Sequence, residues 1–183
     1  SLKALVREIV LSRAYGLAST LDPMAHEADP DNTLHWRHEP RRMDAESLRD
    51  AMLCVSGLLE EGPPRGSIVS RMGDGPVRRL PAADMADGVL RRRSVYLPVV
   101  RGFVPESLEL FDFAEPSLVV AQRDTTNVPA QALYLMNNPQ VLGWARAMAR
   151  RLLADAGLDP RERVALAYRL ALGPQPTPDR KST

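Results

Sequence analysis

Apolar side chains recur at intervals of three and four residues in several long segments of this chain, which is the period of one face of an α-helix. Asp44 has the side chain of a helix N-cap, and Gly62 supplies a helix stop. Four residues between them form one apolar stripe: Leu48, Met52, Val55 and Leu59. This pattern predicts a core-facing helix.

Other segments show the same period. Residues 2–11 predict an amphipathic helix that ends near Gly16, and residues 139–153 carry a broad apolar face opposite several arginines. Shorter helices are expected to start at Pro105 and Pro129, because proline is favoured at the first position of a helix. The chain is therefore expected to be mainly helical.

The last predicted helix has the clearest start. Asp159, Pro160 and Glu162 have the spacing of an N-cap, a first helical residue and the acid of a capping box. Gly173 is placed to end this helix.

The segments between the helices have a different composition. Ser94–Val100 and Ser117–Val120 are rich in β-branched residues and suit two short strands, which can pair as one minimal sheet. Residues 22–40 have loop composition, and residues 62–93 predict a long irregular excursion. We therefore predict a mainly α, bundle-like single domain over residues 1–173. The Pro-rich tail at 174–183 is expected to be the truncated start of a further helix.

Composition excludes several classes of function. Basic and acidic residues number 24 and 23, so no strong field attracts nucleic acid, and nucleic acid is not expected as a partner. No apolar run reaches the roughly 18 residues of a membrane span.

The lone Cys54 is interpreted as a small buried hydrophobe. No haem-attachment, phosphate-loop, dinucleotide or hydrolase motif is present, so neither a cofactor nor an enzymatic activity is predicted.

Several ordered strings carry a family resemblance that covers nearly the whole chain. They are Leu2–Tyr15, Ala28–Asn32, Arg41–Leu53, Val55–Gly57, Arg93–Val99, Leu110–Phe113, Val128–Leu133, Leu135–Asn137 and Tyr168–Gly173. Together they resemble the planctomycete C-terminal domain of unknown function, which is found in large exported proteins that often carry a cytochrome-c-like domain. The resemblance implies a periplasmic or cell-surface location and upstream domains of the same polypeptide as partners. It supplies no activity.

The densest charged string is the first candidate site. Its members are Arg37, Arg41, Arg42, Asp44, Glu46, Arg49 and Asp50. On a helix, Glu46 lies one turn from both Arg42 and Arg49, so these side chains can form a structural lattice of ion pairs. Alternatively, the arginines bind an anionic or sugar ligand, or an acid of the string has a shifted pKa and acts in catalysis.

Two other groups of polar residues have side chains that could bind a ligand or a metal ion. Gln131 and Asn137 lie with Arg123, Asn127 and Asn138 around a predicted helix start, where they can receive a ligand or act as caps and loop ties. The loop with His26, Glu27, Asp29, Asp31, His35 and His38 holds possible metal ligands. Their spacing matches no known site, and no metal site is predicted.

The leading interpretation is a non-catalytic structural or interaction module of an exported multidomain protein, which packs against its upstream domains or a partner protein. The alternative is a carbohydrate- or anion-binding or hydrolytic domain that uses the charged cluster at 41–50. Its candidate surface comprises Arg37, Arg41, Arg42, Glu46, Arg49, Asp50, Gln131 and Asn137.

Overall fold

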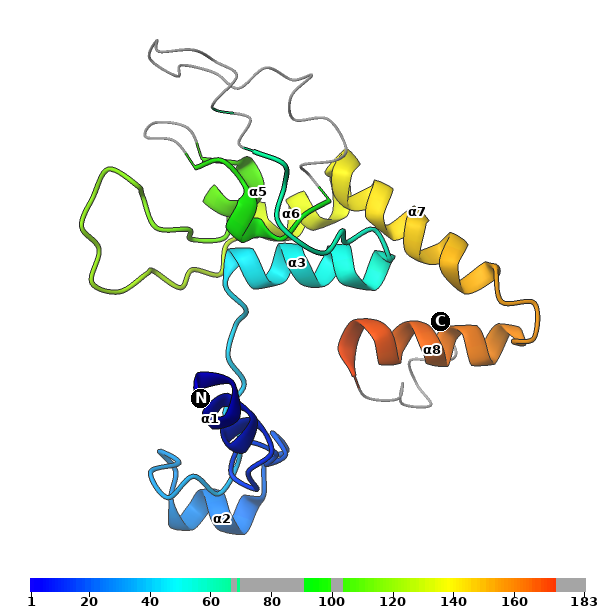
Figure 1. Ribbon diagram of the computed structural model, residues 1–183. Coiled ribbons are helices and arrows are strands. Elements are labelled where there is room, and N and C mark those ends of the chain that lie inside the picture. The colour runs from blue at the N-terminus through cyan, green and yellow to red at the C-terminus, as the bar shows by residue number, and fades with distance from the viewer. Residues whose placement is uncertain (67–68, 70–90, 100–103, 174–183) are drawn as a thin grey trace. The chain divides into compact units, whose positions relative to one another are not determined.

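The computed structural model describes residues 1–66, 69, 91–99 and 104–173 (Figure 1). Its helices are α1 (Leu2–Val10), α2 (Pro23–Ala28), α3 (Ala45–Ser56), the 3-10 helix η2 (Ser94–Tyr96), α5 (Glu106–Glu109), α6 (Pro129–Asn137), α7 (Pro139–Leu153) and α8 (Pro160–Leu172). The prediction of a mainly α fold is confirmed.

The chain divides into two compact units, Ser1–Arg42 and Met43–Thr183, called here the N-terminal and C-terminal units. The prediction of a single domain over residues 1–173 stays a prediction. None of the helices in the described ranges has the length and apolar content that crossing a bilayer requires.

Helix α3 of the C-terminal unit has well-defined caps. The Asp44 side chain accepts a hydrogen bond of 2.8 Å from the Ser47 backbone N–H, as predicted for an N-cap. The helix ends at Ser56, because Gly57 adopts a left-handed conformation at φ +75° and the Leu58 N–H returns to the Leu53 carbonyl. The predicted stop at Gly62 is therefore wrong.

The buried face of α3 is not the apolar stripe. Ala45, Arg49, Leu53 and Ser56 are the buried residues of this helix, and Leu53 is fully inaccessible. Leu48, Met52 and Val55 are half-buried beside this face, where they line an apolar groove of about 360 Å³ with residues of α7 and α8. Cys54 is exposed, so its predicted role as a buried hydrophobe is wrong. It lies on the side of α3 opposite the buried residues, as the helical period requires.

The hydrophobic core gathers around the start of α3. Its buried members are Ala45, Leu97, Leu108, Phe111 and Tyr134. Leu108 lies on the short helix α5 and is fully inaccessible. Phe111 and Tyr134 meet edge to face at 5.9 Å between ring centroids, a favoured aromatic geometry.

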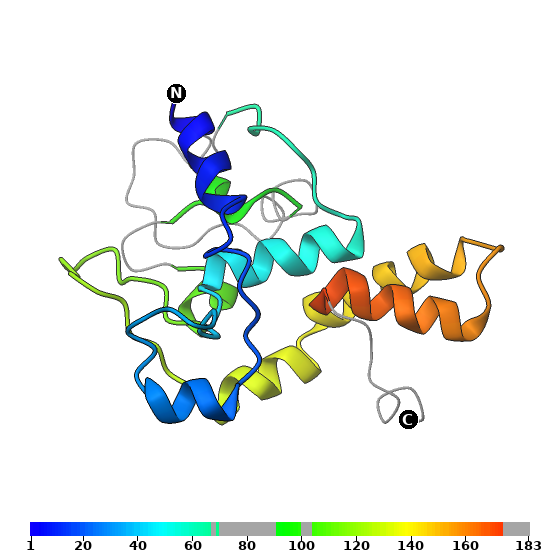
Figure 2. The same ribbon diagram turned by 90° about the horizontal axis from the view of Figure 1, so that it is seen from below.

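The C-terminal helices start where the caps predict. The Asn138 side chain accepts a hydrogen bond from the Gln140 N–H and caps α7. Asp159 and Glu162 form the predicted capping box at the start of α8, with two hydrogen bonds of 2.8 Å. Helix α8 folds back beside α7 and contacts α3 (Figure 2).

Neither predicted strand is present. Ser94–Tyr96 is a 3-10 helix, and the described residues contain no paired strands, only a single bridge between Glu60 and Arg92. The Ser94 N–H bonds the Asp50 carboxylate at 2.7 Å and is therefore not free for a sheet. Residues 117–120 form an exposed turn in which Val119 is fully exposed. Their strand propensity fails because such residues need a packed face to favour a sheet.

The irregular excursion predicted for residues 62–93 is described only near its ends, because residues 67–68 and 70–90 lie outside the described residues, as does the tail at 174–183. Those ends run side by side. The Glu60 N–H bonds the Arg91 carbonyl at 2.8 Å, and the Arg92 guanidinium bonds the Gly62 carbonyl at 2.8 Å.

The N-terminal unit contains α1 and α2. Regular helix in α1 ends at Val10 rather than near Gly16, with turns between the two residues. Helix α2 lies in a segment predicted as loop. It forms because the Asp22 side chain accepts from the N–H groups of Met24 and Ala25 while Pro23 takes the first helical position.

Candidate functional site

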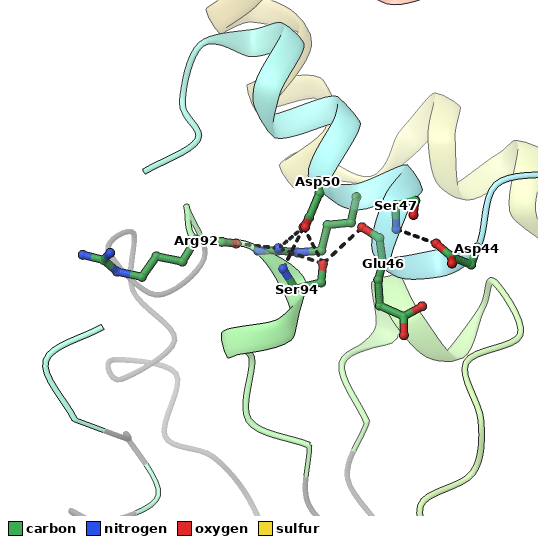
Figure 3. A network of polar contacts seen from close by, with 7 residues as sticks. Asp44, Glu46, Ser47, Asp50, Arg92 and Ser94 are labelled. Atoms are coloured by element: carbon green, nitrogen blue, oxygen red, sulfur yellow. Dashed lines mark hydrogen bonds and ion pairs between the residues drawn. The ribbon is translucent and has the colours of Figure 1, made fainter. Parts of the chain in front are cut away.

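A buried polar network joins α3 to the segment that begins η2 (Figure 3). One oxygen of the Asp50 carboxylate accepts hydrogen bonds of 2.7 Å from both the N–H and the hydroxyl of Ser94. The same oxygen lies 3.5 Å from the Arg49 guanidinium. Asp50 and Ser94 point toward one another in Figure 3, so the carboxylate holds the start of η2 against α3.

Arg49 is the most deeply buried charge in the described ranges. Its side chain is 1% exposed, and its guanidinium donates to the Arg92 carbonyl at 2.9 Å and to the Ser94 hydroxyl at 3.2 Å. It also lies 6.0 Å from the centre of the Trp144 ring. Burial lowers the pKa of Arg49, and Asp50 opposes that effect. The guanidinium remains charged, because arginine is not deprotonated in proteins.

Glu46 pairs with a distant residue. Its two carboxylate oxygens accept hydrogen bonds of 2.7 and 2.9 Å from the Arg123 guanidinium, which is the bidentate geometry of the strongest ion pairs. Arg123 also lies 5.0 Å from the centre of the Phe113 ring. The hydrogen bond to Glu46 is the main cause that raises the pKa of Arg123. This pair joins α3 to the loop that precedes α6.

Glu46, Asp50, Ser94 and Arg123 border a cleft of about 890 Å³. One wall is a row on α3 at helical spacing, formed by Glu46, Asp50 and Cys54. The facing wall is formed by residues 93–95, Leu97, Val99, Phe113 and Arg123. The cleft is open, and its volume is within the usual range for small-molecule sites.

The predicted cluster at 37–50 is divided between the two units. Glu46, Arg49 and Asp50 share one network, whereas Arg37, Arg41 and Arg42 belong to the N-terminal unit. Arg37 lies 5.1 Å from the centre of the Trp36 ring, and Arg41 and Arg42 are exposed. Within the C-terminal unit, the structure brings together the three members of the predicted cluster that lie on α3, which are Glu46, Arg49 and Asp50.

Gln131 and Asn137 do not line this cleft. Gln131 is buried and donates to the Leu110 carbonyl at 3.0 Å and the Thr126 hydroxyl at 3.2 Å, while its oxygen accepts from the Val128 N–H. It is a loop tie, one of the two roles that the sequence left open. Asn137 is exposed and donates to the Leu133 carbonyl within α6. Val128 takes the N-cap position that the sequence favoured for Asn127.

The histidine-containing loop of the N-terminal unit is held by its own side chains. Asp29 accepts hydrogen bonds from the Thr33 N–H and hydroxyl and from the Leu34 N–H, at 2.8 to 3.0 Å. The Trp36 indole donates to the Asp29 carbonyl at 2.9 Å. In the ranges that the structure describes, no three His, Cys, Asp or Glu residues gather as a metal site. The carboxylate of Asp29 is therefore a turn-forming group.

These bonds predict how the loop responds to acid. The Leu34 N–H is the largest cause that holds the pKa of Asp29 below its usual value of 3.8, and burial acts in the opposite direction. A carboxylate whose pKa is lowered by folding stabilises the fold above its unfolded pKa, and that contribution is lost as the pH falls through the folded pKa. We expect the backbone N–H resonance of Leu34, which donates directly to the carboxylate, to shift as Asp29 is protonated, at a pH below 3.8.

An Asp29→Asn variant should lose this acid transition, because the amide does not titrate there. Asp31→Asn, at an exposed neighbouring carboxylate, is the matched control and should keep it. An unchanged transition in Asp29→Asn would show that another group controls the loop.

The sequence did not reveal two members of the network. The sequence pattern places Ser94 in a strand. It groups Arg123 with the polar residues around the predicted helix start at Pro129. Asp50 at one end of the pattern gave no signal for a partner 44 residues away, because such pairing depends on tertiary packing. The bond between Glu46 and Arg123 spans 77 residues and is equally hidden.

A family model described as PSD1, a protein of unknown function (DUF1553), matches residues 1–183. No curated protein and no solved structure matches the chain. The match covers the whole chain but supplies no activity, ligand or partner.

Proposed function

We propose that this chain, which belongs to the PSD1 family of proteins of unknown function (DUF1553), works as a non-catalytic interaction module of a larger exported protein. Its partner is the rest of that polypeptide or another protein at the cell surface or in the periplasm. The resemblance to exported multidomain proteins supports this location, and fractionation that found the protein in the cytoplasm would remove that part of the proposal.

The apolar face of α1 is the observation that carries the proposal. Every residue of α1 is exposed, although the helix has a continuous apolar stripe. The stripe consists of Leu2, Leu5, Val6, Ile9 and Val10, which are 47 to 79% exposed. Scattered exposed apolar residues are ordinary, but a contiguous exposed stripe is typical of an interaction surface.

The charged residues of α3 support a structural role rather than a catalytic one. Arg49, Asp50 and Glu46 have protein partners with good geometry, and these partners connect distant segments of the C-terminal unit. A catalytic acid or base needs a proton-transfer partner in the substrate. Residues committed to cross-links of this kind are better explained by the stability of the fold.

An Ile9→Asp substitution tests whether α1 is a docking surface. In residues 1–183 alone it should leave the melting temperature within about 1 °C, because Ile9 is already 51% exposed. In the native polypeptide it should lower the melting temperature of this module by about 5 °C or more, because a charge then enters an apolar interface. Calorimetry of both proteins measures the difference.

Ala4→Asp is the matched control, because it adds the same charge on the opposite side of α1. It should leave both melting temperatures unchanged. If Ile9→Asp were equally silent in the native polypeptide, α1 would not be the docking surface.

A further inference from the structure

Charged side chains of both signs border the cleft beside α3. Among the described residues of its lining, Glu46 and Asp50 are acidic, and Arg93 and Arg123 are basic. Arg123 is engaged by Glu46 in a bidentate pair. Asp50 is neutralised from behind by the buried Arg49. Arg93 is exposed, and within the described residues it is the arginine of the lining that no carboxylate pairs with.

The remaining lining of the cleft is largely apolar. Val95, Leu97, Val99 and Phe113 contribute side chains to it, and Val95 is 77% exposed. A site with apolar walls and one charged group selects a ligand that has an apolar body and one opposite charge. Arginine favours carboxylates in particular, because its planar fork donates two parallel hydrogen bonds.

We propose that this cleft binds a small organic carboxylate, with Arg93 bonded to the carboxylate group and the apolar walls in contact with the ligand body. This role goes beyond docking, and it uses a residue that the charged pattern at 37–50 did not include. Glu46, Asp50 and their partners act as the rigid frame. Glu46 and Asp50 already have partners within the protein, so they do not compete with the carboxylate of the ligand for Arg93.

Cys54 provides a reporter for this site. It is the single cysteine of the chain, it is exposed, and it lies on the wall of the cleft one helical turn beyond Asp50. A ligand in the cleft should therefore slow the reaction of its thiol with N-ethylmaleimide, an uncharged reagent. The probe is 4-phenylbutyrate, and 4-phenylbutanamide is its uncharged counterpart of nearly the same shape.

We expect 4-phenylbutyrate to slow the Cys54 reaction in a saturable manner and the amide to protect at least tenfold less well. An Arg93→Gln variant should bind the carboxylate at least tenfold more weakly, because the ligand loses the charge-assisted hydrogen bonds of the guanidinium. Arg146→Gln is the control, because it removes an exposed arginine of α7 that does not line the cleft.

Titration calorimetry on a Cys54→Ser variant gives an independent measure of the same binding. Equal protection by carboxylate and amide, or equal affinity of wild type and Arg93→Gln, would overturn the recognition of an anion. Absence of both protection and heat at millimolar probe would overturn the site itself. The docking experiment on α1 is independent of all these outcomes, because it changes a different unit of the chain.

Discussion

An Arg49→Ala variant is expected to lose about 3 kcal/mol or more of unfolding free energy, which is typical when one partner of a buried ionic network is removed. The loss has three physical sources. The carbonyl of Arg92 and the hydroxyl of Ser94 lose a charged donor, Asp50 loses its buried counterion, and a cavity opens beside Trp144. With native proteins stable by only about 5–15 kcal/mol, this is a large fraction of the total.

Denaturant unfolding followed by fluorescence measures this loss. The chain has two tryptophans, of which Trp36 belongs to the N-terminal unit and Trp144 to the C-terminal unit. A Trp36→Phe background therefore restricts the signal to the unit that contains Arg49. Arg146→Ala, at an exposed arginine of α7, is the control and should change stability by less than about 0.5 kcal/mol.

A double-mutant cycle with Asp50→Ala separates the ionic part from the cavity. Residues in one network are expected to couple by about 0.5–3 kcal/mol, so the double variant should lose less than the sum of the single losses. Full additivity, or a loss below about 1 kcal/mol for Arg49→Ala, would show that the network does not hold η2 to α3.

Local signals predicted helix starts well. Asp44, Asn138 and Asp159 are N-caps in the structure, and each acts on backbone N–H groups within three residues of itself. Such bonds need no tertiary information, so the sequence contains everything that decides them. The missed helix α2 also begins with an Asp–Pro pair, and its start was readable by the same rule.

Tertiary packing decided what the sequence could not. Arg49 sits at the centre of the buried face of α3, although its charge favoured an exposed position. It is buried because the Arg92 carbonyl and Ser94 are brought to it from more than 40 residues away. The apolar stripe through Leu48 consequently lies at the edge of the core and is only half-buried. Cys54 lies at the surface.

The candidate site follows the same division. The sequence placed Glu46 and Asp50 on one helical row, and the structure keeps that row as one wall of the cleft. The other wall comes from residues 93–95, Leu97, Val99, Phe113 and Arg123, and the sequence pattern assigns the first part of it to a strand. Its identity depends on the Ser94–Asp50 and Arg123–Glu46 contacts, neither of which leaves a local pattern.

A Leu108→Ala variant is expected to destabilise the C-terminal unit by about 3 kcal/mol, within the range of 2–5 kcal/mol for buried leucines. Leu108 is fully inaccessible and belongs to the core cluster with Ala45, Phe111 and Tyr134. Its helix α5 has only four residues, too few to be stable without packing. The truncation therefore removes apolar contacts from both α5 and α3 and leaves a cavity between them.

The same fluorescence assay in the Trp36→Phe background measures this effect. Leu133→Ala is the matched control, because it deletes the same atoms from a leucine that is 58% exposed on α6. It should cost less than about 1 kcal/mol. Equal losses for the two leucines would mean that α5 does not contribute to the core. A loss confined to Leu108→Ala would show that this buried side chain helps to hold α5 against the start of α3.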